Sequence, residues 1–163
     1  MKGTTVHARK VENFVDELEG MQKRISERAF ELFRSRGAQV GAALDDWLKA
    51  EEQTVWKPAI EICQRDRQLV VEAAVAGIEP KQLQIEATPD TVLLKAEVTH
   101  THPADKGTVY VCEFQTGNLF RLVHLPVKID PDAVKAEFRN GLVRITAALA
   151  QEQRARTVAV EEA

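Results

Sequence analysis

The chain has 163 residues, which is enough for one domain with appendages. It carries 22 Lys and Arg against 25 Asp and Glu, a net charge of −3, and this balance argues against a dedicated nucleic-acid-binding protein. No apolar run approaches the ~20 residues that span a bilayer, so we expect no membrane association. Residues 1–7 lack the apolar core of a secretory signal, and Cys63 and Cys112 lack CxxC spacing. Two free thiols without a signal predict a reducing, cytoplasmic location.

Residues 6–36 are predicted to form an amphipathic helix, because their apolar residues recur at steps of three and four. The helix is expected to end at Arg34, Arg36 and Gly37, since cations favour a helix carboxyl end and glycine can take positive φ there. The stripe could pack on a neighbouring helix or self-associate as a coiled coil, and packing is the simpler interpretation. The stripe consists of Val11, Phe14, Leu18, Met21, Ile25 and Leu32, widened by Val15, Ala29 and Phe33.

A second short helix is expected over residues 44–52, where Leu44, Trp47 and Leu48 share a face. Residues 1–54 are thus predicted to be a helical arm. Its apolar faces need a partner, because two short helices cannot bury much surface alone.

From Trp56 onward the apolar period becomes two, which predicts strands. Asn140-Gly141 is a strong hairpin signal, since a type I′ turn needs positive φ at both central residues. Short strands without intervening helices indicate a mainly β fold, an antiparallel β-sandwich. The expected strands cover residues 59–63, 69–75, 83–87, 91–98, 109–114, 119–125, 134–138 and 142–146.

No catalytic constellation is recognisable, so the sequence predicts neither an enzyme nor a bound cofactor. His100 and His102 place two imidazoles on one side of an extended loop. A structural zinc site usually has four N or S ligands, and no further ligand lies nearby in sequence. Two exposed histidines are therefore the simpler interpretation. Cys63 and Cys112 are interpreted as small strand residues.

Binding is a better prospect than catalysis. The tail valines Val158 and Val160 share one face of an extended segment, which could add a strand to an exposed sheet edge. A disordered tail that happens to contain two valines is the alternative, and the residues alone leave both open.

Residues 56–149 resemble the α-crystallin domain of small heat-shock proteins. Trp56–Ile62 is similar to the family's opening W-x-P-x-(V/I)-(D/E)-I, and Phe120–Pro126 to its later arginine and L-P run. Ala136–Ile145 resembles A-x-x-x-N-G-(V/L)-L-x-(I/V), the most specific of these motifs. Ala76 departs from the family's proline, and the tail offers Val-x-Val in place of I-x-I/V. The resemblance implies an immunoglobulin-like sandwich.

The resemblance also implies how subunits assemble. In members with a long loop, a loop strand pairs with the first strand of the partner subunit. Gly107, Thr108, Val109 and Tyr110 would be that exchanged strand, and Ala59, Ile60, Glu61 and Ile62 its receptor. Arg121 aligns with an arginine that forms ion pairs between strands in members of the family. The edge groove is a candidate client surface, and the tail valines of a neighbouring chain would occupy the same groove. It is lined by Leu83, Ile85, Val134 and Ala136.

Residues 25–52 resemble, more weakly, a short bacterial helical domain of unknown function, mainly through the run from Asp46 to Glu51. That similarity implies an ordered helical arm and no chemistry. The arm's candidate surface for clients or assembly comprises Phe14, Leu18, Met21, Ile25, Phe30 and Phe33.

These inferences predict an ATP-independent holdase chaperone, a homo-oligomer built from dimers whose partners are partly unfolded client proteins. The expected organisation is a helical arm over 1–54, an α-crystallin domain over 55–149 and a tail over 150–163. The alternative is a non-chaperone β-sandwich adaptor that docks one specific protein. Such adaptors are usually monomeric, so native mass separates the two.

Overall fold

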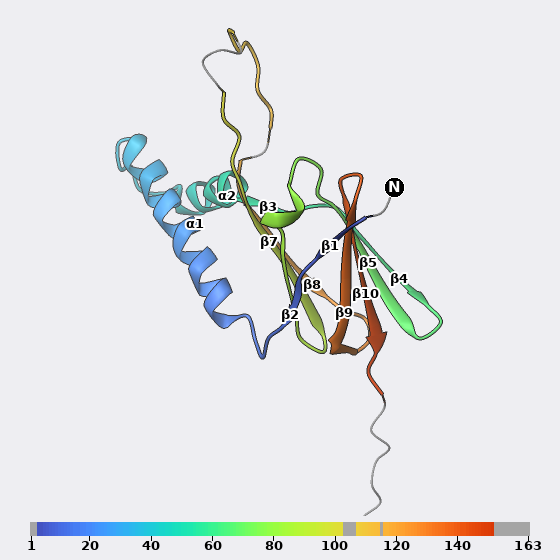
Figure 1. The fold of residues 1–163 in the computed structure, drawn as a ribbon. Coiled ribbons are helices and arrows are strands. Elements are labelled where there is room, and N and C mark those ends of the chain that lie inside the picture. Colours follow the sequence, from blue (N-terminus) through green and yellow to red (C-terminus); the bar gives the residue numbers. More distant parts are fainter. Residues whose placement is uncertain (1–2, 103–106, 115, 152–163) are drawn as a thin grey trace, which may run out of the picture.

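The chain folds into two five-stranded sheets that face one another, with two helices beside them (Figure 1). The structure, a computed structural model, describes residues 3–102, 107–114 and 116–151. The predicted β-sandwich is confirmed. In order across the sheet, sheet A contains β1 (Thr4–Val6), β9 (Ile129–Arg139), β10 (Leu142–Leu149), β5 (Gln68–Ala74) and β4 (Ile60–Arg65). Sheet B contains β2 (Ala8–Lys10), β6 (Gln84–Ala87), β7 (Thr91–Val98), β8 (Gly117–His124) and β3 (Val55–Trp56).

The main core lies between the sheets. Side chains alternate between the two faces of a strand, so every second residue of β5, β7 and β10 enters this core. A single turn of 3-10 helix, η1 (Pro80–Gln82), precedes β6. The largest fully buried side chains of this core are Leu69, Val75, Ile85, Val92, Leu94, Leu119, Ile129, Val143 and Ile145.

The helices α1 (Val15–Ser35) and α2 (Ala43–Thr54) cover the outer face of sheet B. Leu93, which is 0% exposed, packs on the helices, while its neighbour Leu94 faces sheet A. Sheet B is therefore buried on both faces near its middle, which explains the consecutive leucines in β7. The stripe of α1 packs on a sheet as well as on α2. Among the described residues, no helix combines the length and apolar composition needed to cross a membrane.

An ion pair fixes the junction between the helices. Arg36 donates from Nε to both carboxylate oxygens of Asp46 at 3.0 Å, and from Nη2 to Oδ2 at 2.7 Å. The hydrogen bonds from Arg36 lower the pKa of the Asp46 carboxyl. Gly37 follows the helix with a φ of 84°, as expected for the residue that ends it.

The predicted helix over 6–36 is wrong at its amino end, because the helix begins at Val15. Residues 4–10 form β1 and β2 instead. The backbone of this segment pairs with two strands of the sandwich, and this tertiary pairing outweighs a helical apolar pattern. The Val11 amide still hydrogen-bonds to the Ala87 carbonyl at 2.9 Å.

The Asn140-Gly141 turn is confirmed, with φ values of 51° and 77°. The strand expected over 109–114 is wrong for this chain, because these residues form no strand and are exposed. They belong to a loop that projects from the body between β7 and β8 (Figure 1). Among the residues that the structure describes, no strand lies beside them to satisfy a ladder of hydrogen bonds.

Candidate functional site

The edge groove lies where β6 of one sheet and β9 of the other border the sandwich. The structure brings its predicted lining residues together, with Ile85 only 1% exposed. Leu83 and Ala136 are also buried and Val134 is half-buried. The groove is not open, because residues 4–10 of the same chain fill it. We call residues 4–10 the groove segment.

The groove segment adds one strand to each sheet. Its β1 part runs antiparallel to β9, with Val6 opposite Ala136. Its β2 part runs parallel to β6, with Ala8 opposite Ile85. Val6 is 4% exposed and belongs to the main core. This is the strand-addition geometry that was one of the two alternatives for the tail, and here residues 4–10 adopt it.

Charged residues hold the groove segment at its β2 end. Arg9 pairs with the buried carboxylate of Glu86, and Lys95 Nζ lies 3.0 Å from Glu86 Oε1. Burial raises the pKa of the Glu86 carboxyl, but hydrogen bonds from Lys95 and Arg9 outweigh this, and its pKa is lower than usual. Lys95 also pairs with Glu17 of α1. The network therefore connects the segment, sheet B and the helix.

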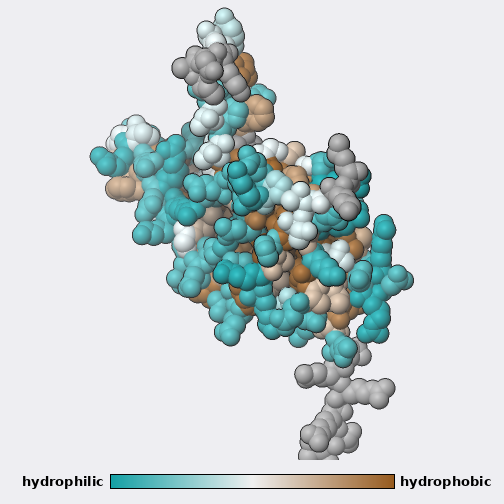
Figure 2. All heavy atoms as spheres, viewed as in Figure 1, coloured by the Kyte–Doolittle hydropathy of each residue, from teal (hydrophilic) through white to brown (hydrophobic). Residues whose placement is uncertain are grey.

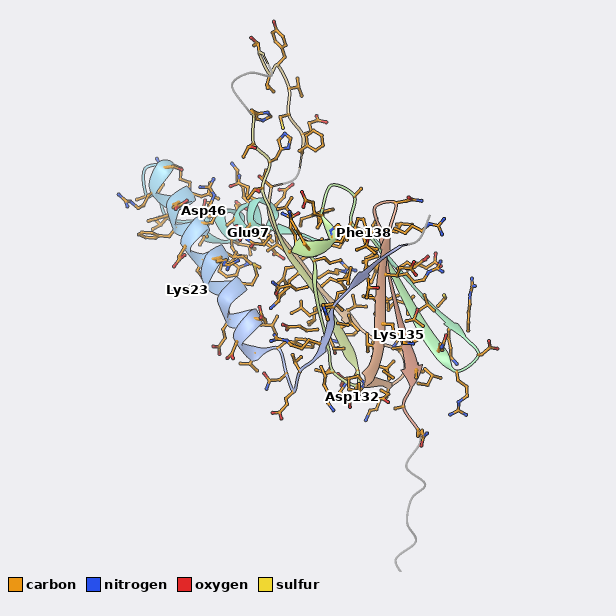
Figure 3. The ribbon with its side chains drawn as sticks, in the orientation of Figure 1. Lys23, Asp46, Glu97, Asp132, Lys135 and Phe138 are labelled. Atoms are coloured by element: carbon orange, nitrogen blue, oxygen red, sulfur yellow. The ribbon has the colours of Figure 1, made fainter. Side chains whose placement is uncertain are left out.

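Lys10, the last residue of β2, forms a further ion pair that is exposed. Lys10 Nζ donates to Asp132 Oδ2 at 2.7 Å, and Figure 3 shows Asp132 at the end of β9 near this segment. The hydrogen bond to Asp132 raises the pKa of the Lys10 ammonium group. Both pairs favour the bound position of the segment.

Sequence reasoning missed the groove segment as a functional element. Its signal was present, since Thr4, Thr5 and Val6 are β-branched and Val6 and Ala8 alternate with polar residues. That signal is short, and Val11 and Phe14 just beyond it fit the helical stripe that continues into α1.

A free strand edge lies at the opposite side of sheet A. β4 contains most of the predicted receptor and pairs with β5 alone among the described strands. Ile60 and Ile62 are half-buried against the core, whereas Ala59 and Glu61 are exposed. The outer edge of β4 thus offers backbone groups to an added strand.

The predicted exchanged residues lie in the projecting loop. Gly107, Thr108, Val109 and Tyr110 are all exposed, Tyr110 at 91%. The structure does not pair them with β4 of the same chain. Val111 and Phe114 are exposed beside them, and Figure 2 shows hydrophobic side chains on this loop. Four large apolar residues exposed together are a liability for an isolated chain.

Arg121 lies on β8, opposite Leu94 of β7. Its Nε atom is buried and has no hydrogen-bond partner among the described residues. A buried donor without an acceptor is costly, so this position favours an additional acceptor from outside the described chain.

The candidate surface of the helical arm divides into two parts. Phe14, Met21 and Ile25 are buried in this chain, so their apolar faces have the partner that the helical arm was expected to need. They cover Leu93 and Phe120 of sheet B, whose outer face is apolar. Leu18 is exposed, Phe30 is 60% exposed and Phe33 is half-buried.

A second groove, different from the edge groove, lies between the helices and sheet B and has a volume of about 570 Å³. Leu18, Trp47 and Leu122 contribute apolar surface to it, and Arg121 lies at its wall. The groove connects the helical arm with the edge of sheet B where β3 ends. The tail residues Val158 and Val160 lie outside the described residues.

Two curated proteins are similar to this chain in sequence. A probable 15 kDa heat shock protein of Leptospira interrogans is 22% identical over 98 residues, covering 60% of this chain and 74% of that protein. Spore protein SP21 of Stigmatella aurantiaca is 25% identical over 89 residues, covering 55% of this chain and 53% of that protein. Residues 21–53 match a protein family of unknown function (DUF2934), as the weaker resemblance implied.

Solved structures share the fold. Heat shock protein 16.0 from Schizosaccharomyces pombe superposes with a TM-score of 0.54 at 22% identity, covering 65% of this chain and 99% of that one. A small heat-shock protein from Xylella fastidiosa gives a TM-score of 0.52 at 22% identity, covering 66% and 98%. The profile of the Hsp20/alpha crystallin family matches residues 61–161, more than half of the chain. The chain belongs to the Hsp20/alpha crystallin family of small heat-shock proteins.

Proposed function

We propose that this small heat-shock protein is an ATP-independent holdase that binds unfolding proteins and prevents their aggregation. The observation that carries the proposal is the apolar groove between the helical arm and sheet B, together with the exposed Leu18 and Phe30 beside it. Contact with apolar client surface removes both surfaces from water, and the charged remainder keeps the complex in solution. Nucleotide and catalysis have no role in this function, which we place in the cytoplasm.

The client surface is larger than the exposed residues alone. The side chains of Phe14, Met21 and Ile25 pack against sheet B. Movement of α1 away from sheet B would add these residues and Phe120 to the apolar surface. Client binding and helix movement are therefore expected to favour one another.

We propose that the basic assembly unit is a strand-exchanged dimer. The free outer edge of β4, the exposed apolar residues of the loop and the unpartnered Arg121 Nε all support it. Residues 107–110 of one copy would pair with residues 59–62 of the other. Each exchange would cover Val109 and Tyr110 and bring a new acceptor near Arg121.

Larger assemblies would use the edge groove. Val158 and Val160 of one chain would dock between β6 and β9 of another, where the groove segment now lies. The two strands need the same backbone groups of β6, so they compete for one site. A Val-x-Val tail loses ~0.8 kcal/mol of burial free energy for each methylene it lacks relative to isoleucine. The groove segment of the same chain therefore competes well with such a tail.

Light scattering tests the holdase function. A heat-labile enzyme is warmed with and without the full-length protein, with no nucleotide present. Suppression of scattering at an equimolar ratio of chains is expected. The paired substitution Leu18→Ser with Phe30→Ser should weaken that suppression several-fold.

The control variant carries Lys23→Ser and Glu27→Ser on exposed positions of the same helix, and it should protect the client as the unsubstituted protein does. Absence of suppression by the unsubstituted protein would refute the holdase function. A monomer in sedimentation together with binding of one specific partner would support the adaptor function instead.

A further inference from the structure

The projecting loop brings together three metal-ligand side chains that are not part of the surfaces described above. His100 and His102 lie on the limb that leaves β7, and Cys112 lies on the limb that returns to β8. One ligand atom from each residue lies within 4.8 Å of the other two. All three residues are exposed. The sequence showed the histidine pair, and the fold of the loop adds the thiol.

His100 makes two ring contacts, one within its own limb and one that joins the two limbs. The rings of His100 and His102 meet edge to face, with centroids 4.7 Å apart and planes at 82°. The His100 ring also stacks on the Phe114 ring, with centroids 4.5 Å apart and an angle of 24° between the planes. Phe114 belongs to the returning limb, two positions beyond Cys112. The stacking therefore limits rotation of His100 and positions it beside the thiol.

The ligand chemistry selects the class of metal. Two imidazoles and one thiolate form a borderline-soft set that suits Zn²⁺, whereas Mg²⁺ and Ca²⁺ prefer oxygen ligands. Tetrahedral bonds of about 2.0–2.3 Å place neighbouring ligand atoms about 3.3–3.8 Å apart. The three atoms lie within 4.8 Å of one another, so they would need to approach by up to about 1.5 Å. Their exposed side chains on a loop without strand pairing can make that adjustment.

We propose that His100, His102 and Cys112 bind one Zn²⁺ ion per chain and thereby join the two limbs of the loop. Cys112 binds as the thiolate, and its proton passes to solvent. Water occupies the fourth position of the tetrahedron. This metal site does not depend on the holdase function, since its ligands belong to neither the groove nor the helical arm.

Metal titration of the full-length chain tests the site. The protein is reduced, stripped with EDTA and titrated with Zn²⁺ in competition with a chromophoric chelator. One Zn²⁺ per chain is expected. Co²⁺ in the same site should give tetrahedral d–d bands and a thiolate-to-metal absorption in the near ultraviolet. Cys112→Ser should abolish that absorption and weaken Zn²⁺ binding by at least ~10-fold. His100→Ala and His102→Ala should each weaken Zn²⁺ binding by a similar factor.

Matched controls exist in the same chain. Cys63→Ser changes the other cysteine, half-buried in β4, and His124→Gln changes an exposed histidine at the end of β8. Both should retain stoichiometric binding and the Co²⁺ spectrum. In EDTA the loop variants should melt at the same temperature as the unsubstituted protein, so lost binding reports lost ligands. Substoichiometric binding by the unsubstituted chain, or unchanged affinity in Cys112→Ser, would overturn the proposal.

Discussion

Lys95 Nζ lies 3.0 Å from Glu86 Oε1, across the β6–β7 pair on the face of sheet B that the helices cover. Glu86 is buried, and it also accepts from Arg9 of the groove segment. Lys95 in turn pairs with Glu17 of α1. One buried carboxylate thus supports both the segment and the helix, and its removal should affect both.

Glu86→Gln is expected to lower the free energy of unfolding by on the order of 3 kcal/mol, because it leaves a partly buried ammonium group with one fewer partner. Urea denaturation at neutral pH measures the change. Glu31→Gln removes the partner of Arg28 in an exposed pair on α1 and serves as the control, with little expected effect. Equal effects of the two substitutions would contradict the importance of the buried network.

The same carboxylate predicts a dependence of stability on pH. The folded-state pKa of Glu86 lies below its unfolded value of about 4.3. Its contribution is therefore fully present above the unfolded pKa and is lost as the pH falls through the folded pKa. The difference in unfolding free energy between the unsubstituted protein and Glu86→Gln should be constant above about pH 5 and shrink in acid. A difference that grows in acid would contradict the sign.

Gly141→Ala should destabilise the sandwich by about 1–3 kcal/mol. Gly141 has a φ of 77°, and an added Cβ would lie 3.1 Å from the Ala76 Cβ atom. Gly20→Ala is the matched control, since an added Cβ there meets nothing within 4 Å. Inside α1 that substitution should stabilise by up to about 1 kcal/mol. Thermal unfolding of the two variants should move in opposite directions.

Arg121→Ala should weaken the dimer while the sandwich stays folded. Within the described chain its Nε has no acceptor, so its main partner is expected in the second copy. Sedimentation equilibrium should show the dimer dissociating at least several-fold more readily. Arg139→Ala, at an exposed position near the hairpin, is the control. If both variants dissociate like the unsubstituted protein, strand exchange does not involve Arg121.

Val6→Ser should release the groove segment, at a cost of about 1–3 kcal/mol, because Val6 is buried opposite Ala136. The freed groove should accept tails, and the native mass should rise. Combining it with Val158→Ala and Val160→Ala should cancel that rise, while the tail substitutions alone should shift assemblies toward dimers. Thr5→Ser, exposed on the same strand, is the control. A rise that persists without the tail valines would show that another segment drives assembly.

Local sequence patterns predict most of the fold. The Asn140-Gly141 turn and the alternation in β10 specify their hairpin within a few residues, so both could be predicted. The groove segment could not, because its pairing with β6 joins residues far apart in sequence and Phe14 extends a helical pattern toward it. Residues 109–114 have the composition of a strand, but a strand needs a neighbouring edge. None of the described strands lies beside the loop. Cys112 joins the two histidines only through the return of the same loop.

The groove segment and α1 are consecutive, with only residues 11–14 between the end of β2 and the start of the helix. The Val11 amide is bonded to β6 and the Phe14 side chain is buried beneath the helix. A ligand that displaces the segment from the groove must therefore disturb the attachment of α1 to sheet B. Occupancy of the groove and detachment of the helix are then thermodynamically linked, and the linkage is reciprocal. A client that draws α1 away from the sheet would raise the affinity of the edge groove for a neighbouring tail. A docked tail would raise the affinity for that client by the same factor.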